Sequence, residues 1–260
     1  MKLDYATLIS PSPLALEQIG NVKSPTLKEI FSPDITYQGY NLFLSLLLMT
    51  PQIYFEKVNP SKFSWYQNLS DDRKDYINMF DVISSDLGLQ NSYAKMFNFF
   101  FVENVIWNKE NRIFITYTDK DKHQNIIPTG IIHRSQFVDL CDIILQRCGI
   151  KRSDTSVDTS KVTNRRALEI LKKIQKGRQN MTKESSGNSD MELPNLITAV
   201  AVKSNSINFI NIWDLTVYQL YEQFRREQYN VYFDIQKMSV AAYGNKDKSF
   251  KGNEWYKSDT

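Results

Sequence analysis

The chain has 260 residues, 42% of them hydrophobic, which is enough for one large domain or two small ones with a buried core. Only nine glycines occur, which argues against an all-β barrel and against a glycine-loop nucleotide fold. The formal net charge of +3 is too small to indicate a nucleic-acid partner by itself.

Prolines punctuate an irregular start over residues 1–40, and helices follow it. A single helical turn is predicted after Pro25, because proline is favoured where a helix begins. A helix is predicted over residues 37–50, ending before Pro51, because the residue preceding a proline avoids the helical region. Its apolar seam repeats at helical spacing, at Tyr40, Phe43, Leu44, Leu47 and Leu48.

Residues 61–101 are predicted to be mostly helical. Ser70 or Asp71 can cap one helix, and Asn91 or Ser92 can begin another. The dense apolar stretch NFFFVENVIW near the end of this region is expected in the core.

The apolar period changes to two over residues 102–132, which predicts a small antiparallel sheet. A turn at residues 108–111 separates two strands, and a polar loop precedes a third short strand. A helix capped by Ser135 is predicted to run to about Cys148, where Gly149 ends it.

The two cysteines lie in this last helix. Cys141 and Cys148 are seven residues apart, roughly 10 Å along a helix, which is too far for a disulfide. Neither His123 nor His133 has the spacing that would complete a metal site with them. We therefore expect reduced core cysteines in a cytosolic protein, surface histidines and no metal.

The strongest charge feature is a helix predicted over residues 164–178. Between Lys161 and Lys183 there are eight basic residues and one acid, Glu169, a net charge of +7. The basic patch comprises Arg165, Arg166, Lys172, Lys173, Lys176 and Arg178. Three interpretations stay open, namely a solvated helix face, contact with an acidic protein and contact with nucleic acid; no aromatic residues interleave to support base stacking. The polar loop that follows, residues 182–192, is the predicted domain boundary.

The C-terminal stretch carries aromatic and aliphatic residues at helical spacing. Asp214 can cap a helix that runs to about Tyr229, and a second short helix with Ile235 and Met238 is predicted before a break at Gly244. This end of the chain either packs on its own domain or docks an apolar seam onto another protein. The candidate partner-binding residues are Trp213, Leu215, Tyr218, Tyr221 and Phe224.

No catalytic pattern is visible in the sequence. GxSxG, HExxH, CxxC and P-loop motifs do not occur. The acid pairs at residues 71–72 and 119–121 are expected to be solvated or to cap helices. We expect no enzyme activity and no cofactor. The start shows no secretory signal, and the longest apolar run, residues 42–49, is far short of the about 20 residues that span a bilayer.

Several strings resemble, in their order, proteins encoded among the tail genes of tailed bacteriophages. They are IGNVKSPTLKEI, YNLFLSLLLMTP, DLTVYQLYEQFRREQ and KGNEWYK. Tail assembly chaperones and baseplate-assembly proteins are the families that the chain resembles. The resemblance implies a non-enzymatic protein of the host cytoplasm that holds apolar helices of a tail component, such as the tape measure, before assembly, or an adaptor within the tail itself. It implies no particular site residues.

These observations predict an α+β fold that is mainly α, with a helical bundle-like core and a small antiparallel β element. We expect a helical domain with the sheet at residues 1–150, a basic helix and flexible linker at 151–192, and a helical module at 193–260. The expected partners are tape measure, tube or baseplate components rather than a membrane, and self-association stays open. The alternatives are a structural subunit of the virion tail and a nucleic-acid-associated protein that uses the basic residues 161–183.

Overall fold

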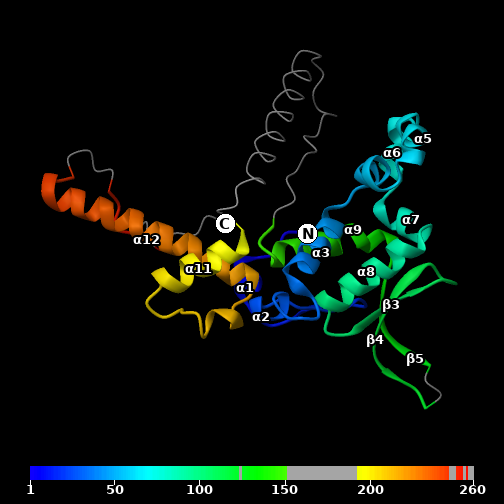
Figure 1. The fold of residues 1–260 in the computed structure, drawn as a ribbon, viewed down its shortest axis with the longest axis horizontal. Helices are drawn as coiled ribbons and strands as arrows, with labels where there is room; N and C mark the ends of the chain where they lie inside the picture. Colours follow the sequence, from blue (N-terminus) through cyan, green and yellow to red (C-terminus); the bar gives the residue numbers. More distant parts are fainter. Residues whose placement is uncertain (123–124, 151–191, 246–249, 254–255, 257–260) are drawn as a thin grey trace. The chain divides into compact units, whose positions relative to one another are not determined.

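Helices dominate the protein, and a two-stranded and a three-stranded antiparallel sheet accompany them (Figure 1). The predicted mainly helical α+β fold is therefore confirmed. The computed structural model describes residues 1–122, 125–150, 192–245, 250–253 and 256. The chain divides into unit 1, Met1–Lys151 with Asp214–Tyr218, and unit 2, Arg152–Trp213 with Gln219–Thr260.

The first 25 residues of unit 1 are more regular than the sequence suggested. They form α1 (Tyr5–Ile9), β1 (Leu14–Leu16) and β2 (Gly20–Val22). The hairpin is held from two sides, since the amide of Ile131 donates to the carbonyl of Gln18 at 2.8 Å and the amide of Val102 donates to that of Asn21 at 2.9 Å. The prediction of an irregular start was wrong, because strands of only three residues are too short to show an alternating apolar pattern.

The next two helices, α2 (Leu27–Ile30) and α3 (Thr36–Leu48), begin and end close to where the sequence placed them. The short helix α4 (Pro51–Ile53) follows and was not predicted. A capping box between Thr26 and Glu29 starts α2. The predicted seam of α3 is correct except at its end, where Leu46 is buried and Leu48 is 38% exposed.

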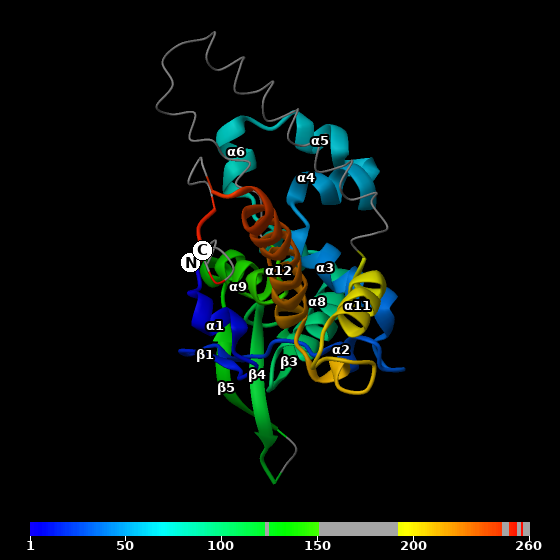
Figure 2. The same ribbon diagram turned by 90° about the vertical axis from the view of Figure 1, so that its left-hand side faces the viewer.

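A run of short helices follows, and its residues 63–76 lie at the opposite end of unit 1 from the hairpin of β4 (Ile113–Lys120) and β5 (Ile126–Ile132) (Figures 1 and 2). It consists of the π-helical turn η1 (Tyr54–Val58), the 3-10 turn η2 (Pro60–Lys62), α5 (Phe63–Gln67), α6 (Asp71–Tyr76) and α7 (Met79–Ser84). The single helix expected after Ser70 is in fact broken, because Asn78 caps α7 with its own capping box. The long helix α8 (Leu87–Phe100) begins earlier than predicted, since Asp86 and not Asn91 or Ser92 is its cap.

The predicted sheet is present as β3 (Asn104–Asn108), β4 (Ile113–Lys120) and β5 (Ile126–Ile132) in the order β3-β4-β5. Phe114 of β4 lies in an aromatic cluster, 5.1 Å from Phe97 of α8 and 4.7 Å from Trp107 of β3 between ring centroids. Phe80 and Phe137 join the same cluster from two other helices. This cluster is the core of unit 1, where large aromatic rings supply most of the buried apolar surface.

The last helix of this region is α9 (Arg134–Arg147), with Cys141 in its middle and Cys148 as its C-cap residue. Its N-cap is His133 rather than Ser135. Cys141 and Cys148 are buried and are not joined by a disulfide, as predicted.

Unit 2 contains α11 (Leu193–Lys203), a 3-10 turn, η5 (Ile212–Asp214), that unit 1 shares at Asp214, and most of α12 (Val217–Tyr243). The sequence predicted two helices between Asp214 and Gly244, but α12 is continuous and ends where Gly244 adopts a positive φ of 78°. No helix in the described part of the chain is both long and apolar enough to cross a membrane.

Candidate partner-binding site

The five candidate partner-binding residues lie at the beginning of α12 and just before it, and all are half-buried. The indole nitrogen of Trp213 donates to the carbonyl of Phe209 at 2.9 Å. Leu215 belongs to unit 1, where its carbonyl accepts from the amide of Leu27 at 2.9 Å. Tyr218 also belongs to unit 1, whereas Tyr221 and Phe224 lie in unit 2. Their role in partner binding stays a prediction.

More exposed apolar residues lie further along the same helix, and the sequence analysis did not select them. Val231, Ile235 and Met238 are 42%, 56% and 65% exposed, and Ala242 is exposed as well. We call these four residues the open seam. Their separations of four, three and four residues follow a heptad repeat and place them on one side of the helix. This spacing was readable in the sequence, but the helix break assumed near Tyr229 hid it.

The opposite side of α12 is covered by the chain that follows it. Phe233 packs against Phe250, with ring centroids 5.3 Å apart. The side chain of Asn245 binds the backbone of Phe250, because it accepts from the amide at 3.3 Å and donates to the carbonyl at 3.2 Å. The open seam lies on the side of α12 away from this contact, and Tyr232 and Tyr243 are exposed beside it.

A groove of about 460 Å³ runs beside the open seam within unit 2. Its lining residues are Lys203, Asn205, Glu227, Asn230, Val231, Phe233 and Asp234. We call it the acidic groove, because Glu227 and Asp234 outnumber Lys203. Glu227 accepts a hydrogen bond from Gln223 at 3.0 Å, and in the described part of the chain no ion pair joins Lys203 to either carboxylate.

A second charged group on α12 is internal to the helix. Glu222 is only 7% exposed, and its carboxylate pairs with the guanidinium groups of Arg225 and Arg226, the latter at 2.8 Å. These pairs at positions i+3 and i+4 stabilise the first half of α12. Among the described residues, the second half of α12, which carries the open seam, has no ion pair of this kind.

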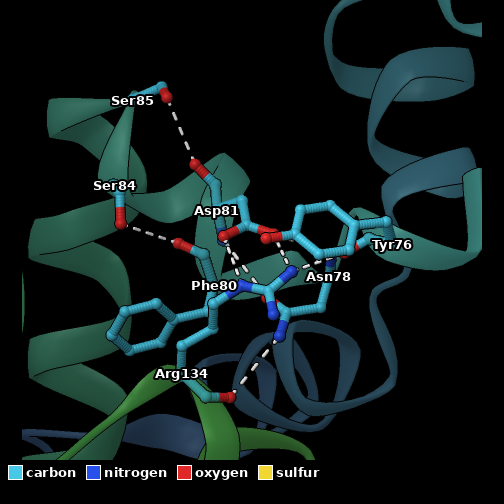
Figure 3. A network of polar contacts seen from close by, with 7 residues as sticks. All are labelled: Tyr76, Asn78, Phe80, Asp81, Ser84, Ser85 and Arg134. Atoms are coloured by element: carbon cyan, nitrogen blue, oxygen red, sulfur yellow. Dashed lines mark hydrogen bonds and ion pairs between the residues drawn. The ribbon is translucent and has the colours of Figure 1, made fainter. Parts of the chain in front are cut away.

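The most connected polar cluster of unit 1 surrounds Arg134 (Figure 3). Its guanidinium makes two hydrogen bonds to Asp81, at 2.7 and 2.8 Å, and a third to the carbonyl of Tyr76, whose ring it also covers at 4.8 Å. Burial raises the pKa of Asp81, but the hydrogen bonds from Arg134 and from the amide of Asn78 outweigh it, so the pKa lies below its ordinary value. Through these bonds Arg134 joins α9 to the last residue of α6 and to the first turn of α7, so the role of the cluster is structural.

A buried arginine near the end of α9 holds the N-terminal segment. Arg147 is 1% exposed and donates to the carbonyls of Thr7, at 3.1 Å, and Ser12, at 2.6 Å. Burial also raises the pKa of the neighbouring Cys148 to about 12, so its thiol stays protonated and unreactive.

The predicted basic patch, Arg165 to Arg178, lies outside the described residues, and so does His123. His133 is exposed and caps α9. Among the described residues, no group of three or more histidine, cysteine, aspartate or glutamate side chains could hold a metal ion.

Comparison with known proteins gives one family match. Residues 182–258 match the family described as YomV second domain, which derives from a Bacillus prophage. No curated protein and no solved structure matches the chain. The match supports the resemblance to bacteriophage proteins for this part of the chain, which contains α11, the acidic groove and the open seam.

Proposed function

We propose that this protein is a non-enzymatic assembly protein of a phage tail or baseplate, a chaperone or an adaptor that binds apolar helices of tail components. The observation that carries the proposal is the open seam on α12, in the part of the chain that is similar to a phage-derived family. A row of exposed apolar side chains at heptad spacing is suited to binding a helix from another protein.

Co-expression with the tail proteins of the same phage tests the proposal. The tagged full chain is expected to retain a tape measure, tube or baseplate component through purification in moderate salt. Recovery of none of these components would contradict it.

A structural subunit of the virion is the alternative, and mass spectrometry of purified particles separates a chaperone from a protein that remains in the tail. A chaperone leaves before assembly is complete and is absent from particles, whereas an adaptor or structural subunit stays in them in a fixed ratio to the other tail proteins.

A further inference from the structure

The open seam and the acidic groove together specify what kind of helix can dock on α12. We infer that the partner segment is an amphipathic helix with an apolar heptad seam and lysine or arginine residues along one flank. This inference rests on the proposed function, whose partner it describes in chemical terms.

The spacing of the open seam identifies the partner as a helix. Val231, Ile235, Met238 and Ala242 cover about three turns, roughly 18 Å of helix length. Side chains separated alternately by four and three residues interlock with a second helix that crosses at a small angle. An extended strand would need side chains at a period of two.

The charges beside the open seam indicate which kind of charged residue flanks the seam of the partner helix. Glu227 and Asp234 are one heptad apart, on the same side of the open seam, and both line the acidic groove. A basic side chain on this flank of the partner helix would enter the groove. There it would meet two carboxylates, of Glu227 and Asp234, and one ammonium group, of Lys203. Such pairs at the rim of an interface decide orientation and partner choice more than they decide affinity.

The same charges argue against a second copy of the chain as the occupant. In an antiparallel pair of α12 helices, the flank with Glu227 and Asp234 would face the same acidic flank of the copy. In a parallel pair it would face Tyr232 and Ser239, which offer no positive charge. A helix with a basic flank is complementary to α12, and another α12 is not.

A peptide experiment with the full chain tests the inference directly. The probe is a synthetic amphipathic helix, roughly three heptads long, with leucines in its seam and lysines on its flanks. The control peptide has the same leucines but carries glutamates on its flanks. The lysine peptide should bind more tightly in fluorescence anisotropy at low salt. The double variant Glu227→Gln/Asp234→Asn should weaken its binding by about three- to tenfold, as expected for two exposed ion pairs.

Matched seam variants localise the binding. Ile235→Asp should weaken the lysine peptide by more than tenfold, because it places a charge in the apolar contact. Val202→Asp, at an exposed apolar position of α11 that belongs neither to the open seam nor to the groove lining, should leave binding unchanged. Circular dichroism verifies that each variant keeps its helices.

Four results would overturn the inference. The two peptides could bind equally, or neither could bind. Ile235→Asp could bind the lysine peptide as tightly as wild type, or wild type could be a dimer that Ile235→Asp converts to a monomer. Co-expression with tail proteins distinguishes a wrong inference about the docking site from a wrong proposed function. If wild type and Ile235→Asp retain a tail protein equally, the seam is not the docking site although the function stands. If wild type retains none but binds the lysine peptide as described, the seam is correct and the tail assignment is not.

Discussion

Gly130 of β5 lies where two parts of unit 1 come into close contact. A Cβ atom added there would be 2.5 Å from the carbonyl oxygen of Ile19 and 2.7 Å from the hydroxyl of Thr116. Thr116 itself donates to that carbonyl at 2.7 Å, so the contact joins the β1–β2 hairpin to the three-stranded sheet.

Gly130→Ala is therefore expected to lower the free energy of unfolding by about 1–3 kcal/mol, because backbone has to move to admit the methyl group. Gly39→Ala is the control: in α3 the nearest atom to its added methyl group would be 3.6 Å away, and alanine should stabilise the helix by about 1 kcal/mol. Urea denaturation of both variants measures the difference. Equal effects of the two substitutions would contradict the role given to Gly130.

Arg147 links the N-terminal segment to α9. Arg147→Met removes the hydrogen bonds to the carbonyls of Thr7 and Ser12 and should cost about 2–3 kcal/mol. Amide hydrogen exchange should accelerate first in α1 and β1. Arg73→Met, at an exposed position of α6, should change neither property. Unchanged exchange in α1 would show that other contacts hold this segment.

At the scale of elements, the Arg134 cluster that joins α9 to α6 and α7 makes stability depend on pH. Asp81 has a lowered pKa in the folded chain, so it stabilises the fold above the ordinary pKa of aspartate, about 4, and this contribution is lost as the pH falls through its folded pKa. Because the two side chains are 39% and 37% exposed, the pair is worth no more than about 1 kcal/mol.

The expected result is that Arg134→Met destabilises the protein at neutral pH and has little effect once Asp81 is protonated. Thermal unfolding from pH 7 to pH 2.5 measures this difference. Asp81→Asn should abolish the pH dependence of the Arg134→Met effect. A difference that is constant across this pH range would place the effect in packing rather than in charge.

At the scale of the whole molecule, unit 1 is completed by residues that lie far along the chain. Leu215 accepts from the amide of Leu27, and the amide of Val217 donates to the carbonyl of Pro25 at 3.2 Å. Thr216 and Val217 are buried in this pairing, 0% and 1% exposed. The predicted boundary assigned these residues to the C-terminal module, but their hydrogen bonds place them in unit 1.

A fragment of residues 1–151 should accordingly be less stable than the full chain, by about 2–4 kcal/mol for the lost hydrogen bonds and buried side chains. The amide of Leu27 should lose its protection from hydrogen exchange. A peptide of residues 210–222 added in trans should restore part of both. A fragment with full stability and a protected Leu27 would show that this pairing is dispensable.

Local patterns in the sequence were sufficient for much of the fold. The spacing of apolar residues predicted α3, the strands β3 to β5 and α9. Helix caps were less certain, since several neighbouring residues such as His133 and Ser135 can serve and only packing selects one. The candidate site could be predicted only in part for a similar reason. The heptad spacing of the open seam is present in the sequence, but these residues form one surface only because α12 is continuous.

The sequence by itself determined a mainly helical chain with a small antiparallel sheet, two buried cysteines and an aromatic core, because periodicity and composition are local properties. Tertiary structure decided which residues pair across long separations, namely the β1–β2 hairpin with β5 and Leu215 with Leu27. It also decided which apolar residues of α12 are uncovered, since Phe250 packs on Phe233 and leaves Val231, Ile235 and Met238 exposed. Exposure depends on what folds against a residue, and no local pattern contains that information.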